Sequence, residues 1–321
     1  MKKVKLVFII IIFLACGCQK KAEGIKPLRI AINWAGEGYI LIAAEKGFFK
    51  KNGINAEIEY ITDYNKRLLL FKEKKFEGTG IVLADFVSLN AEGYNSKLLY
   101  SATYSDTGDA LVCGRDINSI KDLKDKTISF DGVNTFSHYF VLEILNKNGL
   151  TEKDVKFANY PPSMVLEKLE EKEIDAGHCW SPYQYAAIEK GYKILAKAGD
   201  YPGILIDGFI MDEKFVESNK DAVKRLIKSF SEAIEYINFN KKEALSIIAR
   251  YFNIKDEDIE NQFNGINYLT VEDNKKLFNK ENEINLYVSS QKLGNFFLDR
   301  GQISDIPDFD NLIDGSFLQE R

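Results

Sequence analysis

The sequence predicts an α/β protein with two lobes, each a mixed β-sheet flanked by helices. From Pro27 onward, short apolar segments with strand character alternate with amphipathic helical segments. The alternation occurs as two successive runs, and a predicted return strand, Ile204–Met211, follows the second run. About 300 residues follow the N-terminal segment, which suits two domains of ordinary size with a substantial core.

The first run predicts strands covered by helices on both faces, because its order is strand, helix, strand, helix, strand. Asn52-Gly53 ends the first helix, since Gly directly after a helix is a common stop. The expected strands are Leu28–Asn33, Ala56–Ile61, Gly80–Leu83 and Lys97–Thr103, and the expected helices are Tyr39–Lys51, Asn65–Phe76 and Asp85–Glu92.

The second run predicts another α/β unit inserted into the first. A strand at Ala110–Cys113 leaves the first unit before this second unit begins. The expected strands of the second unit are Thr127–Phe130, Val155–Asn159, Ala176–Cys179 and Lys193–Ala196, and its expected helices are Ile120–Leu123, Thr135–Lys147, Met164–Lys172 and Pro182–Lys190. Long helices follow the return strand, at Asp221–Phe239, Lys242–Tyr251 and Ile284–Arg300. We therefore assign 27–114 and 204–321 to a discontinuous lobe I and 115–203 to lobe II. Chain crossings near 110 and 205 would form a hinge beside a cleft, where small-molecule sites are common.

The first residues have the features of a bacterial secretory signal. Three lysines within the first five residues precede an apolar run, 7–15, which is too short to span a bilayer that needs roughly twenty residues. Cys16 and Cys18 follow, and each resembles the lipidation site of a lipoprotein. Cys18 is favoured, with Cys16 as the alternative, because a small residue rather than Leu then lies two positions before the cleavage point.

These features predict a lipoprotein signal peptide at 1–17 and a flexible, polar tether at 18–26. The protein would then be anchored by lipid, such as palmitate, on the extracytoplasmic or periplasmic face of the cell membrane. An uncleaved N-terminal anchor is the alternative.

Composition excludes several other classes of function. The formal net charge is −5, and no basic or aromatic-basic patch is present, which argues against nucleic-acid binding. Beyond the signal, the cysteines are Cys113 and Cys179, which we expect to be buried small side chains; a disulfide between them stays open. His178 adjoins Cys179 in a predicted strand, so the two point to opposite faces, and no metal site or cofactor is predicted.

The motifs resemble those of type II periplasmic binding proteins of ABC transporters, in particular the sulfonate, taurine and nitrate branch, which is related to thiamine-precursor binders. The resemblance covers about residues 27–250 in order. It is carried by Asn33–Tyr39, Ala43–Phe49, Tyr104-Ser105, Gly108–Leu111, Ile120–Lys124, Ser137–Phe140, Tyr160–Pro162, Asp175–Gly177 and Trp180–Tyr183. The Asn-Thr-Asn-His stretch of the thiamine-precursor binders is absent, because Asn33-Trp34-Ala35-Gly36 stands in its place.

The resemblance implies a two-lobed clamp, called a Venus flytrap, that delivers a small anionic solute, such as a sulfonate, taurine or nitrate, to a permease and its ATPase. It implies no catalytic activity, and we expect the protein to be a monomer. The alternatives are a binder of a thiamine pyrimidine precursor, a pyrimidine-synthesising enzyme, and a sensor or adhesin that uses the same clamp.

Candidate ligand contacts lie where strands end and helices begin, because free N–H groups and the helix dipole favour an anion there. Gly36 and Tyr39 lie at the first such junction, although Gly36 also suits a tight turn and Tyr39 also suits core packing. The resemblance places Ser137 and His138 at an anion-facing helix start, where Asn134 or Thr135 would cap the helix.

Aromatic and acidic residues complete the candidate set. Trp34, Trp180 and Tyr183 could face a ligand or pack in the core. Asp85 and Asp109 are candidate hydrogen-bond acceptors, although Asp85 could instead cap its helix. Ser105 adjoins the first chain crossing within a matching motif.

Overall fold

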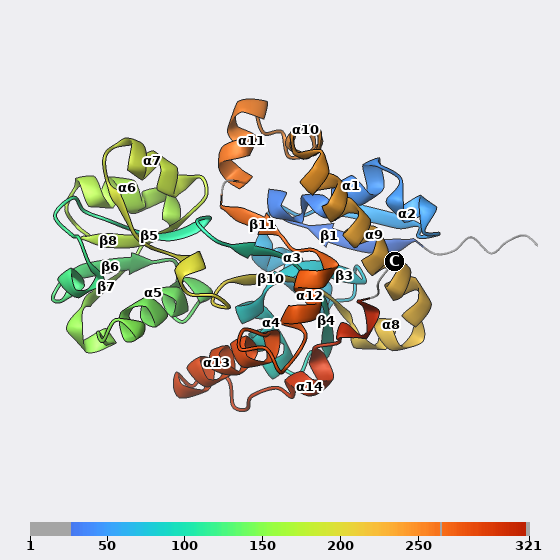
Figure 1. Ribbon diagram of the computed structural model, residues 1–321. Coiled ribbons are helices and arrows are strands. Elements are labelled where there is room, and N and C mark those ends of the chain that lie inside the picture. The colour runs from blue at the N-terminus through green and yellow to red at the C-terminus, as the bar shows by residue number, and fades with distance from the viewer. Residues whose placement is uncertain (1–26, 264, 319–321) are drawn as a thin grey trace, which may run out of the picture.

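The computed structural model describes residues 27–263 and 265–318. The predicted signal peptide, the tether and the lipidation site at Cys18 or Cys16 lie outside these residues. The described chain forms two α/β bodies that lie side by side (Figure 1). None of its helices combines the length and the apolar character needed to cross a membrane.

The first body is built on a six-stranded mixed sheet with the order β11-β4-β10-β3-β1-β2. β1 pairs in parallel with β2 and β3, whereas β10 is antiparallel to β3 and β4. β11 extends the sheet by pairing with the end of β4. The strands are β1 (Leu28–Ile32), β2 (Ala56–Tyr60), β3 (Gly78–Val82), β4 (Ser96–Ser105), β10 (Ile206–Asp212) and β11 (Ile266–Tyr268).

Helices cover both faces of this sheet because its strands are apolar on both sides. Ile30 and Ile32 pack with one group of helices, while Ala31 between them faces the other group. The first group is α1 (Gly38–Glu45), α2 (Phe48–Lys51), α9 (Lys220–Phe239), α10 (Lys241–Phe252) and α11 (Asp256–Phe263). The second is α3 (Tyr64–Lys72), α4 (Leu83–Ala91), α13 (Leu286–Asp299) and α14 (Phe309–Leu312). α8 (Glu213–Ser218) and α12 (Val271–Leu277) connect these elements.

The second body is a five-stranded mixed sheet with the order β7-β6-β8-β5-β9. Its strands are β5 (Asp109–Cys113), β6 (Thr127–Phe130), β7 (Lys156–Asn159), β8 (Ala176–Trp180) and β9 (Lys193–Lys197). α6 (Pro162–Glu170) and α7 (Tyr183–Glu189) pack on one face, and α5 (Phe136–Lys147) packs on the other. Cys113 and Cys179 are both buried, as the sequence predicts, and both are free, so the disulfide that the sequence left open is not formed.

The predicted boundary after residue 114 needs a correction. β5 pairs with β8 and β9, so the second body begins at the start of β5 and not at 115. Two segments connect the bodies, one between β4 and β5 and one between β9 and β10. They are tied together by an ion pair between Lys197 and Asp106 (3.1 Å) and by the N–H of Gly199, which donates to the Asp106 carbonyl (2.8 Å).

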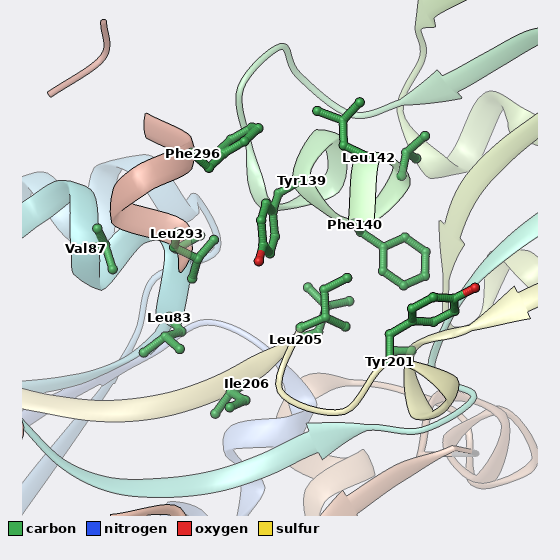
Figure 2. Close-up of a cluster of buried hydrophobic side chains, with 14 of the residues drawn as sticks. Leu83, Val87, Tyr139, Phe140, Leu142, Tyr201, Leu205, Ile206, Leu293 and Phe296 are labelled. Atoms are coloured by element: carbon green, nitrogen blue, oxygen red, sulfur yellow. The ribbon is translucent and has the colours of Figure 1, made fainter. Parts of the chain in front are cut away.

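One apolar cluster extends through both bodies (Figure 2). Tyr139 on α5 lies against Phe296 on α13, with ring centroids 5.2 Å apart. Leu205, in the segment leading into β10, belongs to the same cluster. Arg300, just after α13, forms an ion pair with Glu152 of the second body. The bodies therefore touch through packed side chains as well as through the two connections.

Candidate ligand-binding site

A small cavity lies in the first body, at the end of its sheet nearest the two connections. Its volume is about 20 Å³, which is room for one water-sized molecule. Residues from the loop before α1, from α3 and from strands β3, β4 and β10 line it: Trp34, Gly36, Glu37, Tyr39, Tyr64, Arg67, Gly80, Ile81, Val82, Ala102, Thr103, Asp207 and Gly208. Three residues of the predicted site, Trp34, Gly36 and Tyr39, are therefore brought together here.

Trp34 lies directly on the backbone of the loop that precedes α1. A Cβ added to Gly36 would lie 2.1 Å from the nearest atom of the indole ring, so only glycine leaves room for the ring. Tyr39 is buried behind it, edge-on to Phe230 with ring centroids 5.0 Å apart. Burial raises the pKa of the Tyr39 hydroxyl well above its usual range, so this group stays protonated.

A buried ion pair forms the floor of the cavity. Nη1 of Arg67 donates to Oε1 of Glu37 (2.5 Å), and both side chains are almost fully buried. The other carboxylate oxygen of Glu37 accepts from the N–H groups of Asn33 (2.5 Å) and Trp34 (3.4 Å). The Glu37 carboxylate therefore already accepts from two N–H groups of the loop before α1. The sequence predicted an anionic ligand at this junction.

Asp207 is an acidic group in the same cavity. It lies on β10 opposite Thr103 of β4, whose hydroxyl donates to Oδ2 of Asp207 (3.0 Å). Burial raises the pKa of Asp207 to about 7; the nearby negative charges of Asp109 and Glu37 add to this rise, and Arg67 opposes it. Asp207 is therefore poised between its neutral and charged forms near neutral pH.

Asp85 does not line the cavity but lies behind Tyr64, which does. The hydroxyl of Tyr64, which lines the cavity, donates to Oδ2 of Asp85 (2.7 Å). Burial raises the pKa of Asp85. Asp85 lies in the first turn of α4, whose N-cap is Val82, so the alternative role as a helix cap does not apply.

Three polar residues form a chain in the second body. Ser137 Oγ lies 2.7 Å from Nδ1 of His178, and Nε2 of His178 lies 3.2 Å from Oδ1 of Asp109. Ser137 also accepts from the backbone N–H of Asp131 (2.9 Å). Ser137 and His178 are fully buried, whereas Asp109 is half-buried. His178 thus links two predicted site residues, Ser137 and Asp109.

The remaining residues of the predicted set have different surroundings. Trp180, at the end of β8, packs against Phe136 with ring centroids 5.6 Å apart, and Tyr183 is 41% exposed. His138 is buried and stacked on Phe130, with centroids 4.1 Å apart, and its Nδ1 accepts from the N–H of Asn134 (3.1 Å). Its ring also packs edge-on against Phe296 of the first body, with centroids 6.0 Å apart, and it does not line the cavity.

Ser105 anchors the turn that leads from one body to the other. Its hydroxyl accepts from the N–H of Asp109 (2.7 Å). From the first body, the Gly265 carbonyl accepts from the N–H of Gly108 (3.1 Å); from the second, the Gln184 side chain donates to the Gly108 carbonyl (3.0 Å). The turn is therefore held from both sides, and Asp109 follows it directly.

Sequence reasoning missed four side chains of this site: Glu37, Arg67, Asp207 and His178. Asp207 could have been found from the sequence, because it is a lone acid among apolar residues of a predicted strand. Burying such an acid is costly unless it has a partner. Arg67 carried none, since in the sequence it is one of several basic residues in an amphipathic helix.

Similarity to known proteins agrees with this architecture. The family described as NMT1/THI5 like matches residues 36–244. An inferred binding protein of Brucella abortus is 24% identical over 279 residues, which cover 82% of this chain and 83% of that protein. The periplasmic aliphatic sulphonate binding protein SsuA from Escherichia coli superposes with a TM-score of 0.74 at 15% identity, over 90% of this chain and 97% of SsuA. The desulfurization enzyme DszB shares the fold, with a TM-score of 0.66 at 12% identity over 90% of this chain and 97% of DszB.

Proposed function

This chain belongs to the NMT1/THI5-like family, and we propose that it is the extracytoplasmic solute-binding lipoprotein of an ABC importer. It would capture a small solute between its two bodies and present it to the permease. The observation that carries the proposal is the cavity at the end of the first sheet nearest the two connecting segments, where Trp34, Arg67 and Asp207 are brought together. Clefts between domains are common sites for small molecules.

In this proposal the two connecting segments are the hinge about which the bodies open and close as units. A solute that contacts both walls binds the closed form better than the open form, and so shifts the population toward closure. The SsuA relative is named as a sulfonate binder, which supports a solute with a sulfonate or similar acidic group. The guanidinium of Arg67 and the start of α5 are the groups that could receive it.

A lipid on Cys18, or on Cys16, would hold the clamp at the membrane surface. Replacing Cys18 by Ser should release the protein from the membrane fraction and abolish labelling by radioactive palmitate in cells. Cys16→Ser serves as the matched control and should leave both unchanged. The opposite pattern would move the anchor to Cys16, and labelling that survives both changes would remove the lipoprotein part of the proposal.

The importer proposal is tested by solute-dependent compaction. Small-angle scattering of the protein with sulfonates, nitrate and amino acids should show a smaller radius of gyration with a bound solute, and the same solute should raise the melting temperature. Cells that lack the protein should lose high-affinity uptake of that solute. Tight binding with unchanged uptake would instead favour a sensor.

Catalysis is the second candidate, because DszB shares the fold and Ser137, His178 and Asp109 form a hydrogen-bonded chain. We favour binding, since the Ser137 hydroxyl is fully buried and already accepts from Asp131. Burial also raises the pKa of Cys113 to about 11 and that of Cys179 to about 12, so neither thiol is a ready nucleophile. Turnover of a bound sulfonate or sulfinate by the purified protein would reverse this choice.

A further inference from the structure

A second hollow, far larger than the cavity at the end of the sheet, lies on the helical surface of the first body. It is a groove of about 550 Å³ between α2 and α9, with aromatic walls that include Phe48 and Tyr236. Phe239, which also lines it, is 87% exposed, more than any other large apolar side chain in the part of the chain that the structure describes. Single exposed apolar residues are ordinary, but an exposed ring beside further aromatic walls is typical of a surface that binds another surface.

The segments that form this face are positively charged although the chain as a whole is acidic. Residues 48–51 and 220–243 contain eight basic and four acidic residues, whereas the formal net charge of the whole chain is −5. Three of the four acids are already paired with cations: Asp221 with Arg225, Glu232 with Lys51 and Glu243 with Lys46. Six exposed lysines form no ion pair within 27–263 and 265–318, namely Lys50, Lys220, Lys224, Lys228, Lys241 and Lys242. The charge that remains uncompensated here is therefore positive.

The chain enters the first body close to this groove. β1 begins at Leu28, whose N–H donates to the carbonyl of Asn55 in the loop after α2 (2.7 Å). At the end of α2, Asn52 donates to the hydroxyl of Ser229 (3.1 Å) and to the carboxylate of Glu232 (2.9 Å), both on α9. The start of β1 and α2 lie on the side of the first body that is turned away from the second body (Figure 1).

The proposed lipid anchor would place this face close to a membrane. Nine peptide links join Cys18 to Pro27 and eleven join Cys16 to Pro27. Fully extended, these lengths of chain span at most about 30 Å and about 40 Å. Because the groove lies only one short helix away from the start of β1, the phospholipid headgroups are within its reach.

We propose that the face made by α2, α9 and the start of α10 rests on the membrane, with the Phe239 ring inserted among the headgroups and the exposed lysines against anionic phospholipids. The proposal rests on the lipid anchor of the proposed function. Burial of an apolar ring and attraction of lysines to an anionic surface both favour such a contact. The contact fixes the orientation of the anchored clamp and directs its second body away from the bilayer.

A fluorescent label beside Phe239 tests the contact in the full-length, lipidated protein reconstituted in vesicles. Asn238→Cys places an environment-sensitive dye at an exposed position of α9, and Ile188→Cys places the same dye at an exposed position of α7 in the second body. Cys113 and Cys179 are buried and do not compete for the dye. In vesicles of phosphatidylcholine and phosphatidylglycerol, a quencher carried by the phospholipid should quench the dye at 238 but not at 188. The quenching should decrease at high salt and in phosphatidylcholine alone, because the attraction of the lysines is then screened or removed.

Variants of the same face separate the ring from the charges. In the Asn238→Cys background, Phe239→Ala should lower the ratio of docked to undocked protein by about tenfold or more, since the ring no longer leaves water on docking. Lys228→Gln and Lys241→Gln should each lower it by about fivefold. Lys190→Gln, at an exposed position of the second body, is the matched control and should leave it unchanged. All four side chains are exposed, so these variants should fold as the wild type does.

Other outcomes overturn the proposal. Equal quenching at 238 and 188, quenching that does not depend on phosphatidylglycerol, or quenching that survives Phe239→Ala would each remove the membrane contact. A dye at 238 that is shielded without vesicles, in a protein that sediments as a dimer, would assign the groove to a second copy of the chain instead. Palmitate labelling reports on the anchor separately: a labelled protein with equal quenching keeps the anchor and loses only the docking face, whereas a protein without labelling loses both.

Discussion

His178 joins Ser137 to Asp109: its Nδ1 lies 2.7 Å from the hydroxyl of Ser137, and its Nε2 lies 3.2 Å from the carboxylate of Asp109. The buried start of α5 is thereby connected to the first residue of β5, where the chain enters the second body. A change at Ser137 therefore reaches Asp109 through one imidazole, without any contact between the two residues.

Ser137→Ala should lower the free energy of unfolding by about 1–3 kcal/mol. The change leaves the N–H of Asp131 without its acceptor and removes a partner of His178. Urea denaturation measures the loss. Ser129→Ala is the matched control, since Ser129 is fully buried on the neighbouring β6 and its hydroxyl has no partner among the described residues. A loss as large for Ser129→Ala would show that the hydrogen bonds of Ser137 are not the cause.

Breaking the ion pair between Glu37 and Arg67 should be costly from either side. Glu37→Gln leaves a guanidinium buried without its counter-charge, so we expect a loss of roughly 3–5 kcal/mol in the free energy of unfolding. The double variant Glu37→Gln with Arg67→Met should lose less than the sum of the two single variants, because neither charge remains. An additive result would show that the pair is not coupled.

His138 should make the protein less stable in acid. Burial lowers its pKa to about 4, whereas the unfolded chain has a value of about 6.5, so the unfolded state binds the proton first. The stabilising contribution is complete above pH 6.5 and is lost as the pH falls toward 4, by up to about 3 kcal/mol. The difference in unfolding free energy between the wild type and His138→Gln should therefore shrink over that window. A difference independent of pH would contradict the lowered pKa.

Asp207 should have the opposite effect on the pH dependence of stability and destabilise the protein as the pH rises. Its pKa is raised from 3.8 to about 7, so the folded state binds the proton more tightly than the unfolded state does. Its contribution is present below pH 3.8 and is lost as the pH rises through 7, because the charged form is then buried beside Glu37 and Asp109. Asp207→Asn should therefore gain stability relative to the wild type between pH 4 and pH 8, by roughly 3 kcal/mol. A constant difference across that range would contradict this.

The order of strands and helices through β10 could be predicted because each depends on local periodicity. The first helix was predicted to continue to Lys51, but the structure ends α1 at Glu45 and begins α2 at Phe48. Gly47 between them adopts φ +73, a left-handed conformation that glycine permits and that ends a helix. The glycine at position 47 is therefore the local feature that ends α1 before Lys51.

The larger differences between the predicted and the observed structure arise from contacts between residues far apart in the sequence. β5 has the same apolar character as a strand of either sheet, and only its partners β8 and β9, far along the chain, decide which sheet it joins. β11 is three residues long and exists because it pairs with the end of β4. Likewise Arg67 is buried because Glu37, thirty residues earlier, lies against it, and no local pattern contains that fact.

We predict that Gly36 controls the position of the Trp34 ring. Tryptophan fluorescence can measure this, because the chain has only one other tryptophan, Trp180. In a Trp180→Phe background, Trp34 is the only tryptophan, so selective excitation of tryptophan reports on it alone. Gly36→Ala places a Cβ where the indole now lies, 2.1 Å from its nearest atom, so the ring must move away from the loop and become more exposed. The fluorescence maximum should shift to longer wavelength, and solute binding should weaken because the ring lines the cavity.

Gly114→Ala is the control for this change. The nearest atom to its added Cβ is a carbonyl oxygen at 3.6 Å, an ordinary contact, and Gly114 directly follows β5. We expect its emission and its solute affinity to match those of the Trp180→Phe parent. If Gly36→Ala also leaves the emission unchanged, then the indole does not rest on Gly36 in solution, and Trp34 cannot be assigned as the wall of the cavity.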